Sequence, residues 1–429
     1  MDLERMEPAE LTRLEAELSE RYRGHQRAGL ALDITRGNPS LEQLELARGL
    51  DGVLGGDYRL ADGTDARGYG GGLDGIPEAR ALAAAWLGVE ARETLVGGNS
   101  SLELMYLYLD HAHRQGVRGP ETAWSRLGPA RFLCPVPGYD RHFRITQELG
   151  IELLPLPMGD DGPDMDQAEA MVRDDPAIRG MWCVPKYSNP GGQIYSDAVV
   201  ERVAALARHA GPHFRVMWDN AYAVHDLDAV PASLASVMEA CRRHGTEDAV
   251  VLFGSTSKVT FAGAGMAFMA ASADNLAAFK RMLGVLTIGP DKVNQLRHVR
   301  FLRDMEGVYR HMQGHAGILR PKFDCVQRHL ADGLTGRGMG TWTRPRGGYF
   351  VSFETRPGLA REVVRLAAEV GLKLTPAGAA YPYGKDPRDS HVRIAPSYPP
   401  LAELDRAMEV FVTCVQLASV RQVLGGQAG

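Results

Sequence analysis

The sequence predicts an α/β protein built around a large, mostly parallel sheet, with a second and smaller α/β part. Its 429 residues suffice for two or three domains, and 45% hydrophobic with 24% charged residues is ordinary globular composition. From about residue 77, helical stretches alternate with short apolar runs, which is the pattern of βαβ units. The apolar runs lie at 131–135, 151–155, 180–184, 215–218, 249–254 and 266–271.

The first 75 residues predict one helix, one short strand and a long loop. Apolar residues recur at helical spacing from 8 to 29, a stretch that ends in glycine. Residues 32–36 resemble a strand that enters a Gly-Asn-Pro turn. The Gly- and Asp-rich stretch 51–75 has few core residues and is expected to be loop-like.

The last third of the chain predicts the smaller α/β part. Residues 276–335 are mostly helical in pattern. Two apolar runs, 347–353 and 391–395, flank a helical pattern at 358–371. Two strands beside one helix form a layer that is separate from the large sheet.

Composition argues against several classes of partner. A net charge of −5 predicts neither a nucleic-acid nor a membrane-surface protein. The N-terminal stretch has no apolar core of signal-peptide length, and we expect no apolar run to reach membrane-spanning length. We therefore expect a cytoplasmic protein. Dispersed cysteines without a CxxC pair predict reduced thiols and no metal site; they are Cys134, Cys183, Cys241, Cys325 and Cys414.

The segment from Phe253 to Lys258 places a lysine directly after an apolar strand and a Gly/Ser/Thr turn. In parallel α/β sheets, ligands bind outside the carboxyl ends of the strands. A buried lysine has a lowered pKa and can act as a neutral nucleophile that forms a Schiff base. The neighbouring Ser255 and Ser257 hydroxyls suit a phosphate. The alternative is a solvated lysine in a polar loop.

Asp219 ends the apolar run that begins at Val216, and Tyr222 follows three residues later. An aspartate at such a position can bind the N–H of a pyridinium ring and keep that ring protonated. Tyr222 could reach the phenolic oxygen of the same ring. The alternative is an aspartate that caps the next helix.

Two further turns carry polar groups near strand ends. Asn189 lies in an Asn-Pro-Gly-Gly turn, where its amide either donates to a ring oxygen or serves the turn alone. Residues Asn99, Ser100 and Ser101 follow Gly97-Gly98 and open a helical pattern. Free N–H groups at a helix start bind anions, although simple N-capping explains the same pattern.

Arg393 lies inside the apolar run His391–Ala395. Its planar guanidinium can hold a carboxylate through two hydrogen bonds. A structural ion pair is the alternative.

Lysine, aspartate, asparagine and hydroxyl/glycine sites near strand ends occur here in the order and spacing of one family. The chain resembles the fold-type I, class I aminotransferases from about Asp33 to Pro399, and more narrowly the bacterial aspartate aminotransferases of subgroup Ic. The resemblance rests on long runs: DITRGNPS, VGGNSSLELMY, FLCPVPGYDRHF, GPDMD, WCVPKYSNPGG, WDNAYAVH, STSKVTFAGAG, TIGPDKVNQLRH, RPRGGYFVSF, LTPAGA and VRIAPSYP.

The resemblance implies a fold, a cofactor and an assembly. The expected cofactor is pyridoxal 5′-phosphate (PLP), and the expected assembly is a homodimer with shared active sites. Residues 1–50 would form an N-terminal arm and part of the small domain. Residues 51–300 would form the large PLP-binding domain, and 301–429 the small C-terminal domain.

The resemblance also implies a role for each matched residue. Lys258 would form the Schiff base and shuttle protons, Asp219 would pair with the pyridine nitrogen, and Asn189 and Tyr222 would bind the ring hydroxyl. Tyr139 would stack on the ring, and Gly37 and Arg393 would bind the substrate α-carboxylate. The phosphate would be surrounded by Asn99, Ser100, Ser101, Ser255 and Ser257, with Tyr69 reaching it from the neighbouring subunit.

One position departs from the pattern of many class I enzymes. They carry a phosphate-binding arginine eight residues after the lysine, where this chain has Met266. Subgroup Ic also lacks that arginine. The cation that replaces it is left open, with Lys292 one candidate.

The implied reaction is ping-pong transamination between an L-amino acid and a 2-oxo acid, with aspartate and 2-oxoglutarate expected from the subgroup. A dicarboxylate needs a second cation, for which Lys292 is the first candidate and Arg36 and Arg141 are alternatives. Other amino acids such as alanine, and another PLP reaction such as β-elimination, remain open. A regulator with a fused helix-turn-helix is not expected, because the aminotransferase pattern starts near residue 33.

Overall fold

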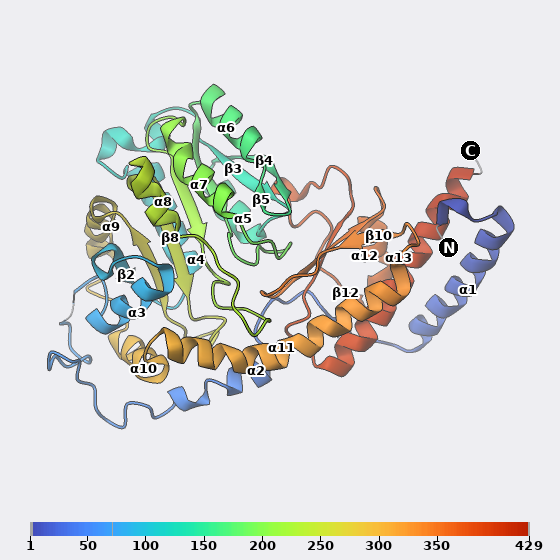
Figure 1. The fold of residues 1–429 in the computed structure, drawn as a ribbon, viewed down its shortest axis with the longest axis horizontal. Coiled ribbons are helices and arrows are strands. Elements are labelled where there is room, and N and C mark those ends of the chain that lie inside the picture. The colour runs from blue at the N-terminus through green and yellow to red at the C-terminus, as the bar shows by residue number, and fades with distance from the viewer. Residues whose placement is uncertain (1–2, 71, 428–429) are drawn as a thin grey trace.

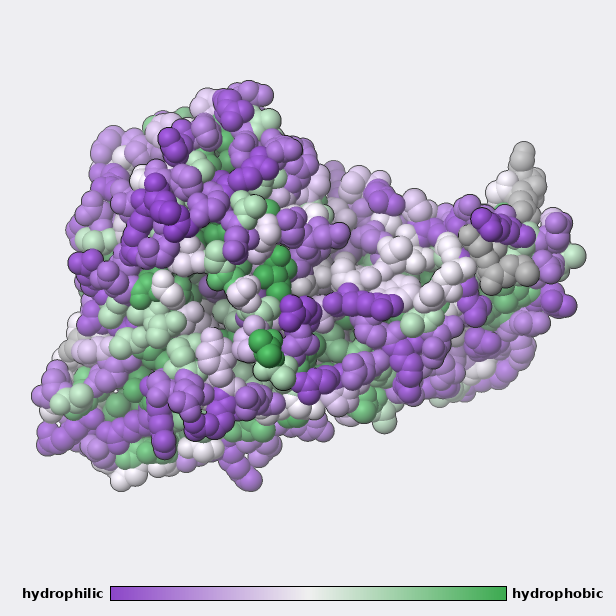
Figure 2. Space-filling view, viewed as in Figure 1, coloured by the Kyte–Doolittle hydropathy of each residue, from purple (hydrophilic) through white to green (hydrophobic). Residues whose placement is uncertain are grey.

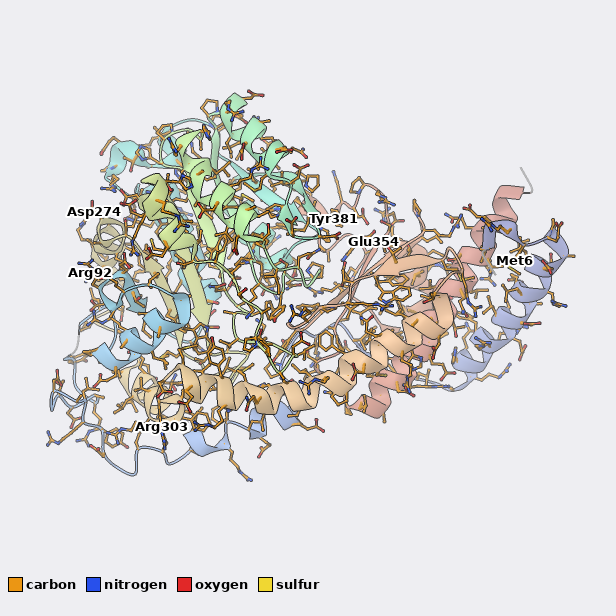
Figure 3. All side chains as sticks on the ribbon, viewed as in Figure 1. Met6, Arg92, Asp274, Arg303, Glu354 and Tyr381 are labelled. Carbon is orange, nitrogen blue, oxygen red and sulfur yellow. The ribbon has the colours of Figure 1, made fainter. Side chains whose placement is uncertain are left out.

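The computed structural model describes residues 3–70 and 72–427. In Figure 1 a large α/β part lies at the left and a smaller part at the right, and α11 runs beneath both. Met6 and Asp274 lie near opposite ends of the molecule (Figure 3).

The helices are α1 Pro8–Arg27, α2 Leu41–Glu45, α3 Pro77–Leu87, α4 Ser101–Arg114, α5 Asp140–Glu148, α6 Met165–Asp174, α7 Asp197–Ala205, α8 Val237–His244, α9 Ala273–Leu286, α10 Lys292–Leu302, α11 Met305–Leu334, α12 Ala360–Glu369 and α13 Leu401–Gln427.

The large sheet has the order β2-β9-β8-β7-β6-β3-β4-β5 within the described residues. Its central strands, from β8 through β7, β6 and β3 to β4, run parallel, whereas β9 runs antiparallel to both of its neighbours. The strands are β2 Thr94–Val96, β3 Arg131–Val136, β4 Glu152–Gly159, β5 Gly162–Pro163, β6 Ile178–Cys183, β7 Arg215–Asp219, β8 Val250–Ser255 and β9 Ala267–Ala271. The parallel centre brings the carboxyl ends of β6, β7 and β8 to one edge, where a ligand site is expected.

Helices cover both faces of this sheet. In β7, Val216 and Trp218 belong to one buried apolar cluster and Met217 to another, as the alternation of a strand requires. Helices α3, α6, α7, α8 and α10 contribute to the first cluster, and α4, α5 and α9 to the second. Because both faces are buried, the strands are apolar throughout, which is why their sequence runs were recognisable.

The smaller part joins the two ends of the chain. Strands β10 (Gly340–Trp342), β11 (Val351–Thr355) and β13 (His391–Ile394) form an antiparallel sheet. The short strands β1 (Leu32–Asp33) and β12 (Leu372–Lys373) pair in parallel, so the N-terminal segment is anchored to the C-terminal region. This arrangement confirms the expected fold class, a mostly parallel sheet with a smaller part formed by both chain ends.

Helix α11 contributes to the cores of both parts. Val308 and Met312 near its start are buried with the large sheet, and Phe323 and Leu330 are buried with the small one. A boundary drawn at residue 300 falls just before this shared helix. The domain limits at 50 and 300 therefore remain predictions.

Helix α13 corrects one expectation. Leu401–Gly426 is long and apolar enough to meet a membrane-span criterion by length and composition, although no such run was expected. However, 72% of its most apolar 18-residue window is buried inside the protein. Met408 and Phe411 pack into the core of the small part, so α13 is the core helix of a folded domain.

Three local predictions also differ from the structure. The strand expected at 32–36 has only two residues, because its partner β12 is equally short. Strand β2 was not predicted, because three residues are too few for a visible alternation. The apolar run at 347–353 enters β11 only at Val351.

Candidate active site

A cavity lies at the carboxyl ends of the central strands. Apolar residues gather on the visible face of the molecule where its two parts meet (Figure 2). The cavity brings together six of the predicted site residues: Ser101, Tyr139, Asn189, Asp219, Tyr222 and Lys258. Asp219 ends β7, Lys258 follows the end of β8, and Ser101 begins α4. Parallel strand direction thus collects side chains that are up to 157 positions apart, from Ser101 to Lys258.

Asp219 is buried and doubly hydrogen-bonded. Its Oδ1 accepts the amide N–H of Ala221 at 3.1 Å, and its Oδ2 lies 2.9 Å from Nε2 of buried His142. The His142 ring stacks on Trp182 with a centroid distance of 4.0 Å. These contacts fix the carboxylate in one orientation within the enclosed site.

Lys258 points into the same cavity. Its Nζ lies 5.0 Å from the centroid of the Tyr222 ring. Burial lowers the pKa of the Lys258 amine, and the charge of Asp219 opposes this shift. Burial also raises the pKa of Tyr222 well above its ordinary value, so its phenol stays protonated at neutral pH. The site therefore combines an amine that loses its proton readily with a phenol that keeps it.

Tyr139 lies on the wall of the cavity near His142. Their rings meet edge to face, with centroids 4.9 Å apart. Burial raises the pKa of Tyr139 to about 12. A neutral aromatic ring in this place offers an apolar surface to a planar ligand.

Arg393 extends from β13 beside the cavity. Its Nη1 donates to Oδ1 of Asn189 and its Nη2 to Oγ1 of Thr375, both at 3.4 Å. It also lies 3.5 Å from Asp140, and its guanidinium stacks on the Phe350 ring at 4.7 Å. The buried Nε of Arg393 has no hydrogen-bond partner among the residues that the structure describes. Long, incomplete hydrogen bonds leave this guanidinium suited to bind an added carboxylate.

Gly37 lies against the same aromatic ring. A Cβ atom at Gly37 would come within 2.1 Å of Phe350, far closer than any real contact. The glycine thus lets the main chain approach the Phe350 ring, on which the guanidinium of Arg393 stacks.

We expect Gly37→Ala to destabilise the protein by about 1–3 kcal/mol, because the buried Phe350 ring must move to admit the methyl group. The free energy of urea unfolding measures this effect. Gly24→Ala is the matched control, since nothing lies within 4 Å of its added Cβ, and it should be neutral or slightly stabilising. Equal free energies of unfolding in Gly37→Ala and Gly24→Ala would contradict the packing argument.

The hydroxyls predicted to bind phosphate cluster near the start of α4. Ser100 caps the helix by accepting the N–H of Glu103 at 3.3 Å. Ser257 donates to the carbonyl of Asn99 at 3.0 Å, and Ser255 accepts the N–H of Ser257 at 3.4 Å. The N-terminus of α4 and these hydroxyls form a set of donors that fits an anion.

Asn99 does not line the cavity of Lys258. Its amide donates to the carbonyl of Gly263, and it lines an adjacent pocket with Met266 and Arg297. Met266 itself is buried in the core. Arg297 is a basic side chain of this pocket that the sequence did not single out, since an arginine within a helical pattern carries no distinctive signal.

Tyr69 and Lys292 lie elsewhere in the single chain. Both line a second pocket with residues 287–291, and neither lines the cavity of Lys258. Tyr69 is 80% exposed. Arg36 stacks on Tyr398 and pairs with Asp33, whereas Arg141 is exposed. None of these cations lines the cavity within one protomer.

All five cysteines are buried and free, as expected of reduced thiols. In the described part of the chain, one group could offer three metal ligands, namely Cys325, His329 and Asp405. Arg328 also donates to Asp405 at 2.6 Å, so a cation already occupies this carboxylate. The expectation of no metal remains a prediction.

Comparison with known proteins identifies the family. The model of the aspartate aminotransferase family matches residues 6–427. The chain is also 44% identical over 391 residues to an aspartate aminotransferase of Corynebacterium glutamicum, covering 91% of this chain and 90% of that protein. The chain belongs to the aspartate aminotransferase family. It is therefore an aminotransferase, a transferase of amino groups between amino acids and 2-oxo acids.

Solved structures agree with this family. The crystal structure of an aspartate transaminase from Corynebacterium glutamicum superposes with a TM-score of 0.94 at 41% identity, covering 98% of this chain and 99% of that one. An α-aminoadipate aminotransferase from Thermus thermophilus, complexed with N-(5′-phosphopyridoxyl)-L-leucine, has a TM-score of 0.73 at 22% identity and covers 92% and 93%. The Thermus thermophilus enzyme shares the fold of this chain. Together the two structures confirm the predicted fold-type I.

The aminotransferase family implies PLP, and the cavity fits that group. Lys258 supplies an amine of lowered pKa, Asp219 a fixed carboxylate, and the start of α4 an anion site. Sequence analysis missed His142 and Phe350. His142 follows the motif residue Tyr139 by three positions, but nothing local indicates its contact with Asp219.

Proposed function

We propose that this aminotransferase transfers the amino group of L-aspartate to 2-oxoglutarate through Lys258. The observation that carries the proposal is the convergence of Lys258, Asp219 and Asn189 on one cavity, with Arg393 hydrogen-bonded to Asn189 at its edge. The choice of aspartate is supported by the relative named aspartate aminotransferase at 44% identity.

PLP, when bound, supplies an aldehyde that links to an amine and a pyridine ring that withdraws electrons from the substrate Cα. Lys258 would hold the aldehyde carbon and, once released as a neutral amine, remove the proton from Cα. Its lowered pKa favours this role. Asp219, fixed by His142, would hold the proton on the ring nitrogen. Asn189 and Tyr222 would donate to the ring oxygen, and the cavity walls would exclude water.

Arg393 and Gly37 would bind the α-carboxylate. We expect Arg393→Lys to raise KM for aspartate about 10–100-fold with a smaller effect on kcat, because a point charge loses the two-pronged contact. Steady-state kinetics measures both constants. Arg388→Lys is the matched control, since Arg388 is exposed and should leave KM unchanged. An unchanged KM in Arg393→Lys would remove Arg393 from substrate binding.

A homodimer is part of the proposal. Apolar side chains are exposed near the pocket of Tyr69 and Lys292: Val285 is 87%, Leu286 59% and Ile288 66% exposed. Large apolar side chains gathered in one place favour burial against another chain. A partner covering this patch could receive Tyr69 at its phosphate site and Lys292 near the distal carboxylate of its substrate.

The cytoplasmic location stays a prediction.

The absorption spectrum of the purified protein with PLP tests the function. We expect the visible band of lysine-linked cofactor to disappear when L-aspartate is added without a 2-oxo acid. A band that responds to alanine and ignores aspartate would overturn the substrate. Release of ammonia and a 2-oxo acid without an acceptor would instead indicate β-elimination. Failure to bind PLP would overturn the whole proposal.

A further inference from the structure

The main chain at Lys258 is held from outside the cavity by four side chains. The carbonyl of Lys258 accepts from Nε2 of His225 at 3.2 Å and from the hydroxyl of Tyr349 at 3.1 Å. The next carbonyl, of Val259, accepts from Nε2 of His311 at 2.6 Å and of His315 at 2.9 Å. Each carbonyl thus uses both of its lone pairs on side-chain donors.

Gln43 connects two of these donors. Its Nε2 donates to Nδ1 of His315 and to the hydroxyl of Tyr349, both at 2.9 Å. Its Oε1 accepts the N–H of Ser40 at 3.0 Å. Gln43 and His315 are fully buried and Tyr349 is 1% exposed, so these bonds are shielded from bulk solvent.

The proton positions in this network follow from the acceptors at its ends. A carbonyl only accepts, so Nε2 of His315 carries the proton and its Nδ1 accepts from Gln43. The hydroxyl of Tyr349 must likewise donate to Lys258 and accept from Gln43. Each bond to the carbonyls and to Gln43 then has one donor and one acceptor. Burial supports the neutral imidazole by lowering the pKa of His315 to about 4.

The network begins in the segment that carries Gly37. Gln43 lies in α2, six residues after Gly37, and Tyr349 precedes Phe350, which contacts both Gly37 and Arg393. We propose that Gln43, His315 and Tyr349 are positioning residues that fix the Lys258–Val259 main chain and couple it to the segment Gly37–Gln43. This inference rests on the proposed role of Lys258 and adds residues that do not line its cavity.

An apolar core could hold a loop in place without buried polar groups. Four polar side chains instead converge on two successive carbonyls, and Gln43 joins two of the four. Each buried polar group costs free energy unless it is hydrogen-bonded. Removing one member leaves its partners unsatisfied, so the network acts as a unit. Members of such a unit should show strongly non-additive effects when they are changed together.

The first test measures the pKa of Lys258 in the cofactor-free full-length protein, by competitive labelling with acetic anhydride across pH and mass spectrometry. In Gln43→Ala and Tyr349→Phe we expect this pKa to rise by about 0.5 or more, because a loosened main chain lets Nζ reach water. In the double variant, the pKa of Lys258 should rise no further than in the single variant with the larger rise. Glu45→Ala is the control, since this α2 side chain is exposed and outside the network.

The second test uses the loaded enzyme and a conservative replacement. We expect Gln43→Ala and His315→Leu to lower kcat about tenfold, with KM for aspartate within about twofold. His315→Gln should recover most of kcat, because a glutamine amide can donate to Val259 and accept from Gln43.

Two results would overturn the inference. One is a Lys258 pKa and kcat in Gln43→Ala and Tyr349→Phe equal to those of Glu45→Ala, whether or not the melting temperature falls. The other is full additivity in the double variant. Tyr349→Phe removes a single oxygen and decides the question if Gln43→Ala fails to fold. Labelling needs neither cofactor nor substrate. Absence of transaminase activity would therefore disprove the proposed function, and the network could still be tested.

Discussion

Lys258→Ala is expected to lower kcat for transamination of aspartate by at least about 10⁴-fold, at the upper end of what a positioned acid–base group contributes. The variant loses both the covalent attachment point and the amine that would move the proton. In the wild type, burial lowers the pKa of the Lys258 amine, so the neutral base is more available than at an exposed lysine. Single-turnover absorbance after addition of L-aspartate measures the loss.

Lys280→Ala is the matched control for Lys258→Ala. Lys280 pairs with Asp74 on the surface at 3.2 Å and does not line the cavity. It should retain the activity and visible spectrum of the wild type. Activity of Lys258→Ala within tenfold of the wild type would disprove the assignment.

Asp219→Asn is expected to lower kcat about 10²–10³-fold while PLP remains bound. An amide has almost the shape of the carboxylate but lacks its charge, so it cannot hold a proton on the ring nitrogen. Losses of this size are typical when one preorganised electrostatic group is removed from an enclosed site. His142 and Ala221, which now bind the carboxylate, constrain the replacement to the same place.

The control for Asp219→Asn is Asp228→Asn, which changes an exposed carboxylate paired with Arg346. Stopped-flow measurement of the half-reaction with aspartate separates the chemical step from PLP binding. If Asp219→Asn lost only cofactor affinity and kept its rate when saturated with PLP, the electrostatic role would be wrong.

The strands and their chemical residues were largely predictable because their signals are local. Strands buried on both faces are apolar at every position, so the runs ending near Asp219 and before Lys258 stand out within five or six residues. In a parallel sheet, residues at strand ends share one edge, which is why separate motifs could be expected to meet. The family resemblance rests on the same short runs.

Other parts of the site depend on contacts between distant segments. His142 meets Asp219 across 77 positions, and neither residue's neighbours indicate it. Tyr69 and Lys292 come together in a pocket apart from the cavity, although the sequence alone could not place them. The prediction that no run reaches membrane-spanning length was wrong for α13, and only its burial in the small part shows that this apolar helix is a core helix.

The sequence by itself determined the family, the succession of the central elements along the chain and six of the residues that line the cavity, since these follow from periodicity and motifs within short windows. Only the tertiary structure decided how Asp219 is fixed, why Gly37 lies against Phe350, and how Gln43 reaches the main chain of Lys258. The physical reason is that such contacts depend on strand order and helix packing, which bring together segments that no local pattern connects.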